Sequence, residues 1–395
     1  MGDLRKELFL SLLSKNISYI LVSMIKIIER NVIKSFYLVS SNEAKDKEIL
    51  MIRELFEDIY QIEVELPDNP LRALNAYLIK GNERNLLVDT GFRKVKSLES
   101  LRQSLKELNV NMDNTDIFLT HLHDDHTGLV PFLLNSNNKA YIHPRESEEI
   151  YNLRKVTYME EINIFNEAMG FPKGEAVSAL KALRDQEGFE ESFTEPTYTD
   201  IKDGETLKVG KYEFKCILTP GHTPAHCCLY EENHRILIGG DLILAKITPN
   251  IAYNLEQWME NPLQEYFDSL DRVASLPIDV TLSSHRAIIR NTKRRIRELK
   301  DHYDLRLEEI MDILANGEKL SPYEIAGRMH WSITIKNWED FPVTQRFFAL
   351  GECMSHLVYL EKLEMINKLY KDGKIYYVIS NKGLVWAIVK YIKES

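Results

Sequence analysis

The sequence predicts an α/β protein in which a large strand-rich domain precedes a small, mainly helical one. The length of 395 residues exceeds that of a usual single domain and favours one large domain with a smaller one. Short runs of β-branched residues alternate with amphipathic helical stretches from about residue 59 onward. Hydrophobic residues make up 44% and charged residues 28% of the chain, which argues against disorder, a fibrous repeat and an integral membrane protein.

The large domain is expected over residues 51–299. Its predicted helical segments are an amphipathic stretch at 95–108, a helical insertion at about 144–200 and a helix at 263–274. Its predicted strands are 59–66, 75–79, 85–88, 116–120, 207–218, 226–230, 235–238 and 279–282. Two strand-rich halves therefore flank the helical insertion.

Residues 1–50 are expected to form an N-terminal helical extension. The apolar segment from residue 8 to residue 41 is interrupted by four basic residues, Lys15, Lys26, Arg30 and Lys34. A membrane-spanning helix needs roughly 20 mostly apolar residues, and a secretory signal needs a small-residue cleavage site that is missing here. We expect no integral membrane segment. A packed or partner-binding helix is favoured, with peripheral membrane contact and a removable leader as alternatives.

Residues 300–395 are expected to form a winged-helix-like domain. Helical patterns at 293–316, 321–329 and 344–363 precede two β-prone runs, 365–370 and 374–379, around Asp372-Gly373, a strong hairpin signal. Ser321 and Glu324 predict a capping box at the second helix. An apolar stripe on the third helix must be buried against the large domain, in a homodimer or on nucleic acid; it comprises Phe347, Phe348, Leu350, Met354, Leu357 and Leu360.

Charge and cysteine usage limit the partners and the compartment. The net charge of −10 and the pI of about 5.7 give no chain-wide positive field, so any RNA binding would have to be local. A basic run from Arg286 to Lys300 is usually a solvated helix face, but next to His285 it would also suit an anionic substrate such as a nucleotide, an acyl-coenzyme A or RNA. The four cysteines show no framework spacing, and a cytoplasmic location is expected.

The decisive segment is Thr120–Gly128, where three histidines and two aspartates fall within six positions directly after a predicted strand. Histidine is the commonest nitrogen ligand for zinc, and a loop at a strand end can aim alternate side chains at one point. Loops in this place also hold the sites of α/β folds. A structural turn gains nothing from such crowding, so the segment predicts a metal site.

This segment is similar to the His-x-His-x-Asp-His motif of the metallo-β-lactamase superfamily, and further motifs of that family follow in order. Leu86–Gly91 resembles its early strand and Asp-Thr-Gly turn, and Thr219–His226 resembles its second histidine motif. Gly239-Gly240-Asp241 resembles its Gly-Asp motif, and His285 stands where its last histidine falls. The resemblance covers about residues 59–290 and implies an αββα sandwich.

The resemblance implies a binuclear, metal-dependent hydrolase, most simply a zinc enzyme, with iron or manganese as alternatives. One ion would be held by His121, His123 and His222, the other by Asp125, His126 and His285, and Asp241 would bridge them. A metal-bound hydroxide would attack an ester, thioester or lactone carbonyl. Asp125 would also orient that water or accept its proton. Ser284 precedes His285 where the family commonly has glycine.

Other residues are candidates for supporting or substrate-binding roles. Asp89 and His226 are candidates for holding the ligands in place by hydrogen bonds, with a turn and a buried strand position as the alternatives. Tyr253 and Trp258 follow Asp241 and could form part of a lid over the substrate, or simply pack; Arg286 could bind an anionic substrate.

Within the superfamily, a catalytic domain with a winged-helix-like tail looks most similar to the β-lactamase-like-protein-2 group, which includes endoribonucleases. An endoribonuclease or other phosphodiesterase on the same metal site is therefore the first alternative function. A mononuclear-iron sulfur dioxygenase is a further alternative.

Overall fold

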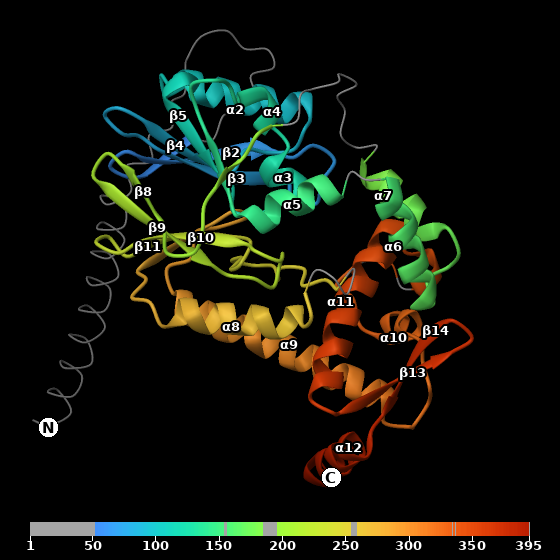
Figure 1. The fold of residues 1–395 in the computed structure, drawn as a ribbon. Helices are drawn as coiled ribbons and strands as arrows, with labels where there is room; N and C mark the ends of the chain where they lie inside the picture. Colours follow the sequence, from blue (N-terminus) through green and yellow to red (C-terminus); the bar gives the residue numbers. More distant parts are fainter. Residues whose placement is uncertain are drawn as a thin grey trace, which may run out of the picture.

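The computed structural model describes residues 52–153, 156–184, 196–253, 259–333, 335 and 337–394. The expected N-terminal extension lies outside these residues, and so does Trp258. Figure 1 shows two sheets packed face to face between outer helices, with a group of helices and a hairpin beside them that ends at the C-terminus. The predicted αββα sandwich is confirmed.

The first sheet has the strand order β1-β2-β3-β4-β5-β6-β7 in the described part of the chain. β1 to β4 pair with one another in antiparallel fashion, whereas β4 to β7 pair in parallel. The strands are β1 (Ile52–Phe56), β2 (Ile59–Glu65), β3 (Ala73–Ile79), β4 (Asn85–Val88), β5 (Thr115–Phe118), β6 (Ala140–Ile142) and β7 (Thr199–Asp200).

The second sheet has the order β12-β11-β10-β9-β8 among the described residues. β11 and β12 run parallel, and the remaining neighbours are antiparallel. The strands are β8 (Thr206–Val209), β9 (Tyr212–Leu218), β10 (Cys227–Glu231), β11 (Ile236–Gly240) and β12 (Val280–Ser283). The single strand expected over 207–218 is a hairpin, because Gly210 turns the chain with a φ of +57°.

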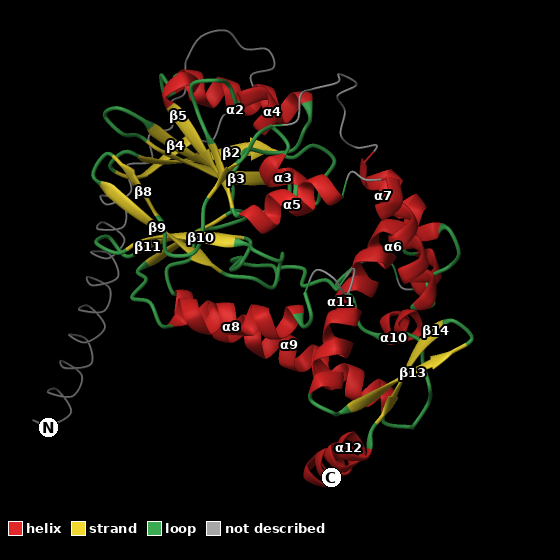
Figure 2. Cartoon of the chain, viewed as in Figure 1, coloured by secondary structure: helices red, strands yellow, loops and turns green. Residues whose placement is uncertain are grey.

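Helices cover the outer faces of both sheets (Figure 2). α2 (Val95–Glu107) buries Leu98, Leu101 and Leu105 against the first sheet, and α8 (Pro262–Ala274) and α9 (Thr292–Leu314) lie on the second. Between the sheets, Tyr77, Phe118 and other apolar side chains form the central core. The shorter helices near the site are α3 (Asp124–Thr127), α4 (Val130–Leu133) and α5 (Pro144–Asn152), and the insertion continues with α6 (Val156–Ala168) and α7 (Glu175–Arg184).

The C-terminal region contains the predicted helices and hairpin. They are α9, α10 (Pro322–Arg328), α11 (Val343–Lys362), β13 (Ile366–Lys371) and β14 (Lys374–Ile379), followed by α12 (Asn381–Glu394), which the sequence analysis did not predict. The capping box of Ser321 and Glu324 is present. The winged-helix assignment stays a prediction.

The expected domain boundary at residues 299 and 300 falls inside α9. This helix packs on α8 and also contacts α10, α11 and β14, and one continuous apolar cluster joins the second sheet to the C-terminal helices. The predicted stripe on α11 is buried in that cluster, except Phe348, which is 39% exposed. None of the helices in the described ranges is long and apolar enough to cross a membrane.

Candidate metal centre

The candidate ligands lie on loops that follow strands of both sheets. β5 delivers His121, His123, Asp125 and His126, the turn between β9 and β10 delivers His222, and the ends of β11 and β12 deliver Asp241 and His285. The parallel pairs β4–β5 and β11–β12 end at the same edge of the sandwich, so their loops converge there. The structure thereby brings all seven sequence-predicted ligands together.

Three histidines form one half of the centre. Nε2 of His121 lies 2.9 Å from Nδ1 of His123, and Nε2 of His222 lies 3.1 Å from the same His123 atom. A tetrahedral zinc ion with Zn–N bonds of about 2.0–2.1 Å sets its ligand nitrogens roughly 3.3 Å apart. The spacing of these nitrogens is close to that value.

The other half is built from Asp125, His126 and His285. Oδ2 of Asp125 lies 3.3 Å from Nε2 of His285 and 3.7 Å from Nε2 of His126. Asp241 stands between the halves: its Oδ1 lies 3.6 Å from His285 and 3.7 Å from His126, while its Oδ2 lies 3.8 Å from Nε2 of His222. One carboxylate oxygen thus faces each half.

Buried polar atoms without partners mark the centre as a place for cations. Three buried atoms have no hydrogen-bond partner among the described residues: Nε2 of His126, Nε2 of His285 and Oδ1 of Asp241. Leaving such atoms unpaired costs about 1–3 kcal/mol each, and native proteins rarely leave them so. The ligand atoms of three groups lie within 4.8 Å of one another: His121 with His123 and His222, His121 with His126 and Asp241, and Asp125 with His126 and His285. Nitrogen and carboxylate donors in this number fit divalent metal ions.

In three of the histidines, the ring nitrogen Nδ1, which points away from the centre, forms a hydrogen bond with another group of the protein, as is usual for metal ligands. Nδ1 of His126 lies 2.8 Å from Oδ2 of Asp89, which also accepts from the hydroxyl of Thr120 at 2.9 Å. Nδ1 of His222 donates to the carbonyl of Asn250, and Nδ1 of His285 donates to that of Ala73. Asp89 thus contacts the ring of a candidate ligand, and its supporting role stays a prediction.

His226 supports Asp241 through the backbone. Its Nδ1 lies 2.8 Å from the hydroxyl of Thr219, and its Nε2 accepts the backbone N–H of Asp241 at 3.1 Å. Burial lowers the pKa of His226 to about 3, so the ring is neutral and able to accept. Gly240, with φ +51°, leaves room for this ring, because a Cβ there would lie 2.3 Å from Nε2 of His226.

Glu146 on α5 connects two ligand loops, a role that the sequence analysis missed. Its Oε2 accepts the N–H of Leu122 at 2.8 Å, and its Oε1 accepts the N–H of Ala225 at 2.5 Å. Leu122 separates two ligands, and Ala225 follows His222 by three residues. Burial raises the pKa of Glu146 to about 7, although the two N–H groups favour the ionised form. No sequence signal singles out this residue, because its partners are distant backbone groups.

The two halves of the centre differ in charge. Burial lowers the pKa of His121 and His222 well below the usual range and that of His123 to about 4, so these rings are neutral. Burial also opposes a charge on His126, but the carboxylates of Asp89, Asp125 and Asp241 outweigh it and raise its pKa to about 10. In His285, Asp241 and Asp125 likewise outweigh burial and raise the pKa.

A cavity of about 570 Å³ opens onto His123, Asp125, His222 and Asp241. One side is formed by the loops after β2 and β4, and the floor by the 244–250 segment that follows Asp241. The other side, here called the C-terminal wall, consists of Trp331, Ile333, Phe341, Gln345, Phe348, Ala349 and Glu352. The small domain is therefore part of the site.

Two of the substrate residues expected from the sequence, Tyr253 and Arg286, are not among the described residues that line this cavity. Tyr253 is 6% exposed and packs near Phe165, and its backbone N–H donates to the carbonyl of Gly351 on α11. The guanidinium of Arg286 donates to the carbonyl of Pro70, which is itself a lining residue, at 3.0 Å. Both residues were proposed to bind substrate because they lie near a candidate ligand in the sequence. Nearness in the sequence does not determine where a side chain points.

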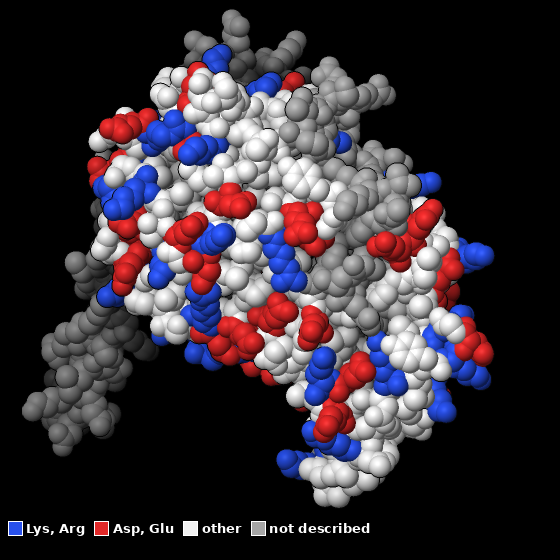
Figure 3. All heavy atoms as spheres, viewed as in Figure 1, with Lys and Arg blue, Asp and Glu red and all other residues white. Residues whose placement is uncertain are grey.

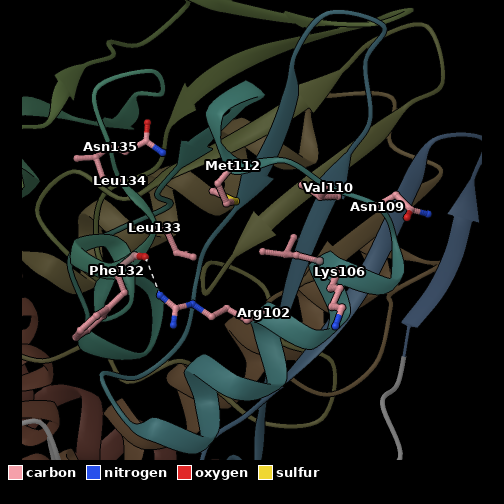
Figure 4. Close-up of a pocket in the computed structure, with 10 residues that line it drawn as sticks. Arg102, Lys106, Asn109, Val110, Met112, Phe132, Leu133, Leu134 and Asn135 are labelled. Atoms are coloured by element: carbon pink, nitrogen blue, oxygen red, sulfur yellow. Dashed lines mark hydrogen bonds between the residues drawn. The ribbon is translucent and has the colours of Figure 1, made fainter.

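A second hollow of about 510 Å³ lies on the outer side of the first sheet (Figure 4). Arg102 and Lys106 of α2 line it together with Phe132 and Asn135, and the guanidinium of Arg102 donates to the carbonyl of Phe132 at 3.3 Å. None of the grouped ligands lies there. We therefore assign the chemistry to the cavity beside the histidines.

Comparisons with known proteins agree with this geometry. Residues 70–285 match the family model described as "Metallo-beta-lactamase superfamily". The chain is 23% identical over 329 residues to "Probable metallo-hydrolase YqjP" of Bacillus subtilis, which covers 81% of this chain and 98% of that one. It is 25% identical to "Beta-lactamase-like protein 2 homolog" of Caenorhabditis elegans, over 77% of this chain and 81% of the relative.

A match to "Atrochrysone carboxyl ACP thioesterase" of Aspergillus fumigatus has 24% identity and covers 62% of this chain and 61% of the relative. Among solved structures, a metallo-beta-lactamase family protein from Thermus thermophilus superposes with a TM-score of 0.64 and 26% identity. That match covers 82% of this chain and all of the other. Its full coverage of the other chain indicates that the likeness extends beyond the ligand loops.

Proposed function

The chain belongs to the metallo-beta-lactamase superfamily and is a metal-dependent hydrolase, and from that premise we propose that it hydrolyses a small ester, thioester or lactone, with a thioester favoured. The proposed centre holds about two divalent ions, zinc in the first place. The proposed ligands are His121, His123, Asp125, His126, His222, Asp241 and His285. The observation that carries the proposal is the Asp241 carboxylate, whose Oδ2 faces His222 and whose Oδ1 faces His285, beside a largely apolar cavity.

Bound divalent ions lower the pKa of water toward about 7 and stabilise the negative charge that develops on a carbonyl oxygen. The chain itself positions the reactants. Asp125 lines the cavity, and its carboxylate is the proposed acceptor for a proton of the attacking water, since it lies within the ligand cluster and faces the substrate space. The histidines hold their geometry through Asp89, Asn250 and Ala73.

The groups at the cavity support a leaving group that departs without a proton. Apart from His123 and His222, the only basic side chains among the described lining residues are Arg93 and Lys94. The Lys94 ammonium donates to the carbonyl of Pro67 at 3.0 Å and lies 3.7 Å from Asp68. A thiol has a pKa of about 8.5 and leaves as the thiolate, whereas an amine leaving group needs a proton, for which Asp125, after it has accepted one from the water, is the one donor proposed here. This supports a thioester over an amide.

The relative with thioesterase in its name supports the same choice. The ribonuclease alternative finds less support, because a groove for RNA needs several cations along the phosphate path. Figure 3 shows that Lys and Arg alternate with Asp and Glu on the face displayed, which lacks a broad basic surface.

The test is a substrate panel with zinc-loaded protein. Acetyl and octanoyl thioesters of N-acetylcysteamine, a lactone, bis(p-nitrophenyl) phosphate and a single-stranded RNA are compared, with Asp125→Ala as the inactive control. Thioester hydrolysis that depends on both zinc and Asp125 is expected. Turnover of phosphodiester or RNA without thioester turnover would overturn the proposal.

A further inference from the structure

We propose that the C-terminal wall binds an apolar acyl group of the substrate and that Phe348 sets the preference for acyl length. This inference rests on the proposed function, because it assigns the cavity beside the ligands to the acyl side of the bond that is hydrolysed. It also gives the small domain a part in substrate selection.

One face of α11 is turned toward the ligands. Gln345, Phe348, Ala349 and Glu352 all line the cavity, and their spacings of three and four residues place them on one side of the helix. The two apolar side chains occupy the middle of this stripe. Phe348 is 39% exposed although the rest of the predicted α11 stripe is buried, and it is one of the residues that line the cavity.

The surfaces that face α11 are apolar as well. Leu71 and Phe92 come from the loops after β2 and β4, and Leu244, Ile247 and Pro249 come from the segment after Asp241. An extended acyl chain entering between these surfaces would keep its carbonyl at the ligand end, beside His123 and Asp241. The volume of about 570 Å³ is in the range of pockets that enclose small ligands, roughly 300–1,000 Å³.

Hydrogen bonds and ring contacts hold the wall in place. The indole N–H of Trp331 donates to the carbonyl of Ala326 at 2.8 Å, and the guanidinium of Arg306 lies 4.4 Å from the centre of its ring. The hydroxyl of Tyr303 on α9 donates to the carbonyl of Pro249 in the floor segment at 2.6 Å. Just beyond this segment, the N–H of Tyr253 donates to the carbonyl of Gly351 on α11. A preformed wall binds an apolar group without a large cost in ordering.

Charge at the cavity favours an acyl group over a polyanion. Besides the ligands, Asp124 and Glu352 contribute carboxylates, and Arg93 and Lys94 contribute the cations. Phosphates of an RNA would meet acidic as well as basic groups, whereas an uncharged alkyl chain meets the apolar surfaces of Phe348, Leu71 and Phe92.

Burial of one methylene is worth about 0.8 kcal/mol, which is roughly a fourfold gain in kcat/KM for each methylene that the cavity encloses. The test uses zinc-loaded, full-length protein and the acetyl, butanoyl, hexanoyl and octanoyl thioesters of N-acetylcysteamine, with thiol release as the assay. From acetyl to hexanoyl, kcat/KM is expected to rise by up to about 200-fold.

Phe348→Ala should lower the ratio of octanoyl to acetyl kcat/KM by roughly tenfold, mainly through KM, and Phe348→Leu should restore much of it. Leu305→Ala is the matched control: Leu305 is 65% exposed on α9, outside the cavity lining, and its loss should leave the ratio unchanged. Circular dichroism reports whether each variant is folded.

A ratio that is the same in wild type, Phe348→Ala and Leu305→Ala, with zinc-dependent thioester hydrolysis intact, would overturn this inference and leave the proposed function standing. Equal kcat/KM for all four thioesters in the wild type would do the same. Absence of thioester hydrolysis from zinc-loaded wild type would overturn the proposed function and this inference with it.

Discussion

Replacing Glu146 by glutamine separates the positioning of the ligands from the stability of the fold. Each carboxylate oxygen of Glu146 accepts one backbone N–H, from Leu122 and from Ala225. Glutamine has one oxygen, so one of these N–H groups loses its acceptor and faces an NH₂ donor. A buried donor without an acceptor costs about 1–3 kcal/mol.

In the metal-free Glu146→Gln protein, the two loops can move apart and avoid the unpaired N–H group. Around a bound ion they must stay together, so the cost of the unpaired N–H group lowers the free energy of zinc binding. Partners behind a ligand typically change metal affinity by about 10–100-fold, which corresponds to roughly 1.4–2.8 kcal/mol. We expect Glu146→Gln to weaken zinc binding within this range, measured by competition with a chromophoric chelator. Glu148→Gln removes the same charge from the exposed side of α5 and is the control.

A Glu146→Gln protein that binds zinc as tightly as Glu148→Gln would refute this reasoning, even if its melting temperature were lower. In that case Glu146 would stabilise the fold equally with and without metal. Parallel thermal melts of the metal-free and zinc-loaded proteins distinguish the two results.

Three further predictions concern the same site. Asp241→Ala should abolish turnover and lower zinc binding to about one ion per chain. The circular dichroism spectrum should stay unchanged, because the Asp241 carboxylate contacts the candidate ligands His222 and His285 and not the apolar core. Full turnover would contradict the bridging role. Zinc affinity should rise as the pH rises toward about 10, because the pKa of His126 is raised to about 10 in the metal-free protein and this ring must lose its proton to bind zinc. Calorimetry at pH 7 in buffers of different ionisation enthalpy should detect the release of about one proton or more on zinc binding. Zinc binding without proton release would contradict this prediction. A chain that stops at residue 299 should fail to give a cooperative melt, because the cut divides α9 and removes Tyr303 from Pro249; a soluble, cooperatively melting fragment would show that the domains are separable.

The sequence pointed to the candidate ligands because each motif follows a run of residues that is recognisable as a buried strand. Thr120–Gly128 carries four of the seven candidate ligands in one loop, and the resemblance of the remaining motifs to those of the family indicated the other three. Strand pairing then fixes where these loops meet, since parallel strands end at one edge of a sheet. Short elements such as β7, which has two residues, carry too little periodicity to be predicted.

The cavity could not be predicted in the same way. Phe348 belongs to an apolar stripe whose other members are buried, and the helical pattern does not show which member faces the ligands. Glu146 is one of several acidic residues in its helix, and only the fold brings it to Leu122 and Ala225. Contacts between segments far apart in the chain decide both roles.

The measurement that tests the central claim most directly is the metal content of the purified, catalytically active protein, determined by elemental analysis together with protein concentration. The shared carboxylate of Asp241 and the two ligand groups predict about two divalent ions per chain, most of them zinc. A consistent value of one iron per chain in active protein would contradict the binuclear hydrolase and favour the dioxygenase alternative.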